Sequence, residues 1–142
     1  MHISRRHLLA TSFLSSSIAG CLATKTSETK ITSVKIANWT NKSQSIIIRI
    51  SRNGTRMYEE SYELKSQPEF GNSDNLAPSI SQEWLLEPGE FLIQAKLSTD
   101  DIWTEKMFPT NNDSNMCYLI TISVLRDNEI SIGYDPDSDG CD

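Results

Sequence analysis

The chain has 142 residues and a formal net charge of −6, from 19 acidic and 13 basic side chains. This length fits a single domain of ordinary size. The acidic balance argues against nucleic-acid binding, because such a partner requires a positive patch and the sequence holds no cluster of basic residues.

Residues 4–21, SRRHLLATSFLSSSIAGC, join two arginines to a weakly apolar run that ends in a cysteine. Ser4-Arg5-Arg6-His7-Leu8-Leu9 resembles the twin-arginine export signal, and Ile18-Ala19-Gly20-Cys21 resembles the lipobox of secreted lipoproteins. The apolar run is too short and too rich in serine to span a bilayer, which takes about 20 apolar residues. The alternative interpretation is an amphipathic or buried N-terminal helix.

The two motifs together resemble the small twin-arginine-exported lipoproteins of halophilic archaea. The resemblance implies that Arg5 and Arg6 direct export, that residues 1–20 are removed and that the Cys21 thiol takes a lipid. The protein would then be anchored to the cell membrane and would face the outside. Cys21 is followed by all 19 acidic residues and by 11 of the 13 basic ones, so the mature chain has a net charge of −8.

The cysteines and histidines limit the chemistry of this mature chain. Thiols tend to oxidise outside the cell, and with Cys21 lipidated, Cys117 and Cys141 remain for one disulfide; two free thiols are the alternative. Both histidines, His2 and His7, lie in the segment expected to be removed. Their loss excludes Ser-His-Asp and Cys-His catalysis, zinc sites with histidine ligands and blue-copper sites. No cofactor is expected.

Residues 21–30 are polar and predict a short tether, and residues 31–142 predict an all-β domain with an acidic C-terminal tail. Alternating and β-branched stretches predict strands at 31–38, 43–52, 56–64, 79–86, 90–99, 102–108, 117–125 and 129–134, with a polar loop at 65–78. Short strands and frequent turns predict an antiparallel β-sandwich of about seven or eight strands, which resembles immunoglobulin-like or transthyretin-like domains. Strand 102–108 is expected at an edge, with Trp103 as a contact residue.

The apolar rows of the last two strands predict how they pair. A three-residue loop, 126–128, places Ile130 and Ile132 opposite Val124 and Ile122, so that both rows share one face. Asn128 suits the left-handed position that ends such a loop. The same register places Asp137 opposite Cys117, which brings Cys141 into its neighbourhood.

The same parity argument applies to the hairpin around Asn53-Gly54. It favours a three-residue loop over a two-residue turn, with Tyr58 and Tyr62 opposite Ile50 and Ile46.

Two further motifs carry less information. Among four Asn-x-Ser/Thr sequons, at Asn38, Asn41, Asn53 and Asn112, we expect Asn53 and Asn112 to be the possible glycosylation sites. Asp135, Asp137 and Asp139, followed by Gly140, match the start of a calcium-binding loop. The chain ends before the carboxylate that such a loop requires at position 12, so a solvated acidic tail is the simpler interpretation.

These features predict a non-catalytic, lipid-anchored binding or accessory module, with an unknown surface protein or small ligand as its partner. The first alternative is a structural envelope component without a specific ligand. The second is a hydrolase that uses a pair of carboxylates, because acidic residues are plentiful. A domain of this size has little room for both a core and a substrate cleft.

Overall fold

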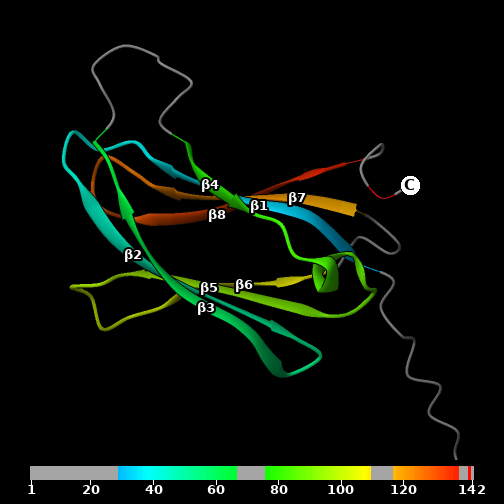
Figure 1. Ribbon diagram of the computed structural model, residues 1–142. Helices are drawn as coiled ribbons and strands as arrows, with labels where there is room; N and C mark the ends of the chain where they lie inside the picture. The colour runs from blue at the N-terminus through cyan, green and yellow to red at the C-terminus, as the bar shows by residue number, and fades with distance from the viewer. Residues whose placement is uncertain (1–28, 67–75, 110–116, 138–140, 142) are drawn as a thin grey trace, which may run out of the picture.

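The computed structural model describes residues 29–66, 76–109, 117–137 and 141, in which two four-stranded sheets face each other (Figure 1). The predicted all-β, antiparallel sandwich of seven or eight strands is confirmed. The strands are β1 (Lys30–Asn38), β2 (Gln44–Arg52), β3 (Thr55–Leu64), β4 (Leu76–Ile80), β5 (Phe91–Leu97), β6 (Thr104–Phe108), β7 (Cys117–Val124) and β8 (Ile130–Pro136).

One sheet has the strand order β4-β1-β7-β8 and the other has the order β3-β2-β5-β6. Neighbouring strands are antiparallel except β1 and β7, which are parallel. The short strand β6 lies at an edge, as predicted. Because β1 and β7 run together, Lys30 and Cys117 lie side by side at one end of the sandwich.

The core is built by alternation along the central strands. In β5 every second residue, from Phe91 to Leu97, is buried, and β2 buries Ile46, Ile48 and Ile50 in the same way. These rows pack against the buried residues of β1 and β7 in the opposite sheet. Five partly buried apolar or aromatic side chains pack against this core: Tyr58, Tyr62, Trp84, Ile130 and Tyr134.

The β7–β8 hairpin has the predicted register. Val124 pairs with Ile130 and Ile122 with Ile132, and Asn128 has a φ of 63°. The hydrogen bond from the Leu125 N–H to the Glu129 carbonyl, 2.8 Å, closes a loop of three residues. A side chain that tolerates the left-handed conformation therefore ends the loop, as the sequence indicated.

The β2–β3 hairpin has the predicted pairs but not the predicted loop. Tyr58 lies opposite Ile50 and Tyr62 opposite Ile46, yet Asn53 and Gly54 form a two-residue turn, with φ values of 50° and 81°. The expected three-residue loop is therefore wrong. The register shifts between Ile50 and Ser51, so a bulge absorbs the extra residue and allows the tight turn whose twist matches the strands.

The predicted strand at 79–86 is also wrong. β4 ends at Ile80, and Glu83–Leu86 form a short 3-10 helix. A strand would place Trp84 and Leu86 on one face. The helix instead buries Leu85 completely and leaves Leu86 46% exposed. Part of the expected loop at 65–78 belongs to β4.

The sandwich has two distinct ends, which we call proximal and distal. The proximal end holds Thr29, the Asn53-Gly54 turn, the segment 81–90 and Cys141; it lies at the right of Figure 1. Hydrogen bonds from Gly89 N–H to the Thr29 carbonyl, 3.0 Å, and from Asn53 N–H to the Glu90 carbonyl, 2.7 Å, tie it together. The distal end holds the loops 39–43, 98–103 and 125–129.

Candidate functional site

The distal loop 39–43 is built around the side chain of Asn38, which is only 3% exposed. Its Oδ1 accepts hydrogen bonds from the N–H and the hydroxyl of Thr40, at 3.0 and 2.6 Å. Its Nδ2 donates to the carbonyls of Lys42, 2.8 Å, and Lys65, 3.0 Å. One amide at the end of β1 thus shapes the loop and links it to the opposite sheet.

This loop exposes Trp39. The Trp39 N–H donates to the Val124 carbonyl, 2.9 Å, which joins the start of this loop to the end of β7. Trp39 is 48% exposed and Leu125 36%. Gln44 Nε2 lies 3.1 Å from Asn128 Oδ1, so the two loops are also joined by a hydrogen bond between side chains. They present two apolar side chains from a fixed backbone.

The third distal loop, 98–103, exposes Ile102. This side chain is 83% exposed, more than any other large apolar residue that the structure describes. The loop is fixed at its base by the hydrogen bond from Ser98 N–H to the Ser45 carbonyl, 2.9 Å, and by contact between the two hydroxyls, 2.7 Å. We use the name distal patch for the exposed apolar side chains of the three distal loops, Trp39, Ile102 and Leu125.

Trp103, the tryptophan expected to make contacts, is half-buried on the outer face of the sheet. The Arg49 guanidinium lies 4.1 Å from the centre of its ring and the Lys96 ammonium 5.1 Å away. Arg49 is in turn held by Glu59, with 2.5 Å between Nε and Oε1. The exposed tryptophan is Trp39, which the sequence analysis did not single out.

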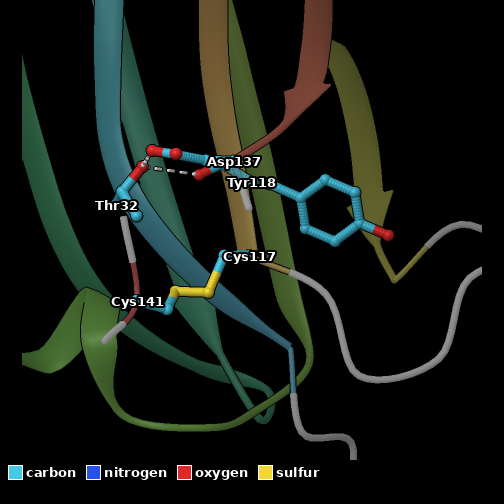
Figure 2. The surroundings of a disulfide bond; sticks show 5 residues. All are labelled: Thr32, Cys117, Tyr118, Asp137 and Cys141. Atoms are coloured by element: carbon cyan, nitrogen blue, oxygen red, sulfur yellow. Dashed lines mark hydrogen bonds between the residues drawn. A yellow bond between two sulfur atoms is a disulfide. The ribbon is translucent and has the colours of Figure 1, made fainter. Parts of the chain in front are cut away.

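The proximal end contains the predicted disulfide (Figure 2). Cys117 and Cys141 are joined, with their Cα atoms 6.0 Å apart. The Asp137 N–H donates to the Cys117 carbonyl, 2.8 Å, as the hairpin register predicted. The Thr32 hydroxyl lies 3.1 Å from both Asp137 Oδ2 and the Tyr118 carbonyl, so β1 holds the same segment.

The two described acidic residues of the suggested calcium loop, Asp135 and Asp137, do not form a cation site. Asp135 lies in β8, and the Asp137 carboxylate accepts the hydrogen bond from Thr32. Asp139 is outside the described residues. Within the described ranges, no three or more His, Cys, Asp or Glu side chains are grouped so that they could hold a metal ion.

The sequons differ in accessibility. Asn38 is buried and both of its amide hydrogens are donated, so its side chain is structural. Asn53 is exposed, and its Oδ1 accepts a hydrogen bond from the Glu90 N–H, 2.9 Å. Asn112 lies outside the described residues, as do Arg5, Arg6 and Cys21.

Two ionisable groups are perturbed by their surroundings. Burial, followed by a hydrogen bond with the Tyr62 hydroxyl, raises the pKa of Tyr58 well above its ordinary value of 10.0. The hydrogen bond from Arg49 lowers the pKa of Glu59. Glu59 therefore stays ionised at neutral pH and is unsuited to act as a general acid.

Comparison with known proteins identifies no family. No family model matches the chain, and no curated protein matches it. In the part of the chain that is described, no helix is long and apolar enough to cross a membrane.

Proposed function

We propose that the protein is a non-catalytic β-sandwich, anchored by a lipid on Cys21 to the outer side of the cell membrane, where it acts as a binding or accessory module. The proposal joins the export and lipobox motifs of residues 4–21 to the placement of the chain in the fold. Cys21 precedes Thr29 by eight residues, and Thr29 is fixed at the proximal end.

The observation that carries the proposal is the polarity of the sandwich. The chain enters at the proximal end, where the disulfide also lies, and the distal patch is at the opposite end. A lipid anchor would therefore hold the proximal end near the membrane and present Trp39, Ile102 and Leu125 outward. Exposed apolar side chains on rigidly held loops are typical of binding surfaces.

The absence of histidine after residue 7 supports a non-catalytic role, because it removes the most common general base. The carboxylate hydrolase remains the weaker alternative. It needs one carboxyl held protonated near a second, ionised one, and Glu59 is held ionised by Arg49.

The anchoring is tested with two variants of the full chain in the cells that produce it. Changing Arg5 and Arg6 together to Lys should leave unprocessed precursor in the cytoplasm. Cys21→Ser should release the processed domain into the medium, because the lipid has no attachment point. A Cys21→Ser protein that stays on membranes washed with high salt would contradict a lipid anchor.

A further inference from the structure

We propose that Asn53, in the turn between β2 and β3, accepts an N-linked glycan and that the buried Asn38 does not, although both stand in Asn-x-Ser/Thr sequons. The donor is a glycan joined through phosphate to a membrane lipid. This inference rests on the proposed function, because N-linked glycans are carried by exported proteins. It adds a covalent modification and identifies the sequon that takes it.

The first argument is exposure. All three residues of the sequon Asn53-Gly54-Thr55 are exposed, at the tip of the β2–β3 hairpin (Figure 1). A Cβ atom added to Gly54 would meet nothing within 4 Å apart from its chain neighbours, so the space beside the middle of the sequon is open. A glycan is bulky and hydrophilic, and the folded protein can carry one only where the surroundings are free in this way.

The second argument is the hydrogen bonding of Asn53. Its Oδ1 accepts a hydrogen bond from the Glu90 N–H, 2.9 Å, and its own N–H donates to the Glu90 carbonyl, 2.7 Å. These two bonds hold the residue in place. Among the described residues, no group accepts a hydrogen bond from the Nδ2 of Asn53. This nitrogen can therefore exchange a hydrogen for a sugar without breaking a contact of the fold.

The reaction leaves the amide with one hydrogen fewer and one sugar more. A bond forms between Nδ2 and the anomeric carbon of the glycan, and the bond from that carbon to the phosphate oxygen of the lipid carrier breaks. The electron pair of the broken bond leaves with the phosphate, and the amide proton passes to water. The transferring enzyme recognises the residue two positions after the asparagine, and Thr55 is exposed for this contact.

Asn38 shows the opposite arrangement in the sequon that ends at Thr40. Asn38 is 3% exposed and Thr40 is 4% exposed. The Nδ2 of Asn38 donates both of its hydrogens, one to the Lys42 carbonyl and one to the Lys65 carbonyl, so a sugar on this nitrogen would remove one of these bonds. The Thr40 hydroxyl is also engaged, 2.6 Å from Asn38 Oδ1. A glycan at Asn38 is therefore incompatible with the folded domain.

The sequon at residues 41–43 lies between these two cases. It is exposed, but the carbonyl of its middle residue, Lys42, accepts hydrogen bonds from Asn38 Nδ2 and from the Thr40 hydroxyl, 2.8 and 2.9 Å. An enzyme that reshapes this backbone would leave buried groups without partners, which costs free energy. We therefore expect a smaller modified fraction here than at Asn53.

The test uses the full-length protein recovered from the membrane of the cells that produce it. Proteolysis followed by mass spectrometry gives the modified fraction at each sequon and at Cys21 in one sample. We expect a glycan on the peptide that contains Asn53, a smaller fraction at Asn41 and none at Asn38. Thr55→Ala should remove the mass of the glycan from the Asn53 peptide, whereas the matched control Thr55→Ser keeps the sequon and should retain it.

Short synthetic peptides separate the effect of the fold from the preference of the enzyme. Peptides of residues 35–41 and 50–56, each with one complete sequon, are incubated with membranes of the producing cells. We expect both peptides to accept the glycan, because neither is folded, while the whole protein accepts it at Asn53 and not at Asn38. Refusal of the first peptide alone would contradict the protection of Asn38 by burial.

Three further results would overturn the inference. They are an unmodified Asn53 on protein whose Cys21 carries a lipid, a glycan at Asn38 of the folded protein, and a modified fraction at Asn41 that equals or exceeds that at Asn53. Because Cys21 is lipidated in these cases, the proposed function would stand. Protein that keeps residues 1–20 would instead contradict the proposed function, and the inference with it.

Discussion

Asn38 shows how one side chain can determine the shape of a surface. It is buried at the end of β1, and its amide satisfies backbone groups of Thr40, Lys42 and Lys65. No other residue type offers a carbonyl acceptor and two donors on so short a side chain. The exposure of Trp39 one residue later follows from this arrangement.

Replacing Asn38 with Ala should destabilise the domain by about 2 kcal/mol, because buried backbone groups lose their partners. Asn41→Ala is the matched control: Asn41 is exposed in the same loop, and its replacement should change the free energy of unfolding by less than about 0.5 kcal/mol. Urea unfolding followed by circular dichroism measures both variants. Equal stability of the two would refute the structural role of Asn38.

Tyr58 gives a second prediction at this scale, on the dependence of stability on pH. Its pKa is raised in the folded state, first by burial, so the unfolded chain loses this proton at lower pH than the folded one. The contribution of Tyr58 is therefore fully present below about pH 10 and is lost as the pH rises further. The fall in urea midpoint between pH 9 and pH 11 should be smaller in Tyr58→Phe than in the unchanged protein. The same fall in both would contradict this.

At the scale of elements, the turn between β2 and β3 depends on Gly54. Its φ of 81° lies in the left-handed region, and open space surrounds the position of an added Cβ. Gly54→Ala should therefore cost about 1 kcal/mol from backbone strain alone. Gly133→Ala, in a strand with ordinary contact to the Thr121 carbonyl, should not destabilise the domain. Thermal unfolding of both variants decides, and an unchanged melting temperature for Gly54→Ala would count against the tight turn.

The disulfide also connects elements, since it joins Cys141, after the end of β8, to Cys117 at the start of β7. Closing the loop between Cys117 and Cys141, 24 residues apart, should contribute about 3 kcal/mol by the chain-entropy account. Cys141→Ser should therefore lower the melting temperature by several degrees with an unchanged circular dichroism spectrum. Unchanged stability after this substitution, or free thiols in protein recovered from cells, would contradict a structural disulfide.

The predictable elements are those whose signal is local. Alternation in β2, β5 and β7 identified these strands, and parity gave the β7–β8 register, with Asp137 beside Cys117. The same parity argument gave the wrong loop length at the Asn53-Gly54 turn. The bulge in β3 adds one residue to that strand, so a two-residue turn is compatible with the pairs that the argument had assigned to a three-residue loop. The 3-10 helix at Glu83–Leu86 depends on where Leu85 meets the core, which is a tertiary contact. The parallel pairing of β1 with β7 is equally non-local.

The candidate site was predictable only in part for the same reason. Arg49, whose guanidinium lies over Trp103, comes from β2, 54 residues earlier in the sequence. The one sequence feature that could have indicated an exposed Trp39 is its position after an asparagine in a segment rich in turn-forming residues. The Trp39 backbone is held by a hydrogen bond to the Val124 carbonyl, 85 residues later, and such a long-range contact cannot be predicted from the local sequence.

At the scale of the whole molecule, the proposed function requires the proximal end to lie near the membrane and the distal patch to point away from it. The direct test is energy transfer from an encoded fluorescent residue at position 86 or 102 to acceptor lipids, in membranes that carry the lipidated full-length protein. We predict efficient transfer from position 86 and weak transfer from position 102, with a difference in distance from the bilayer of about 30 Å. Equal transfer from the two positions, or stronger transfer from position 102, would contradict the account.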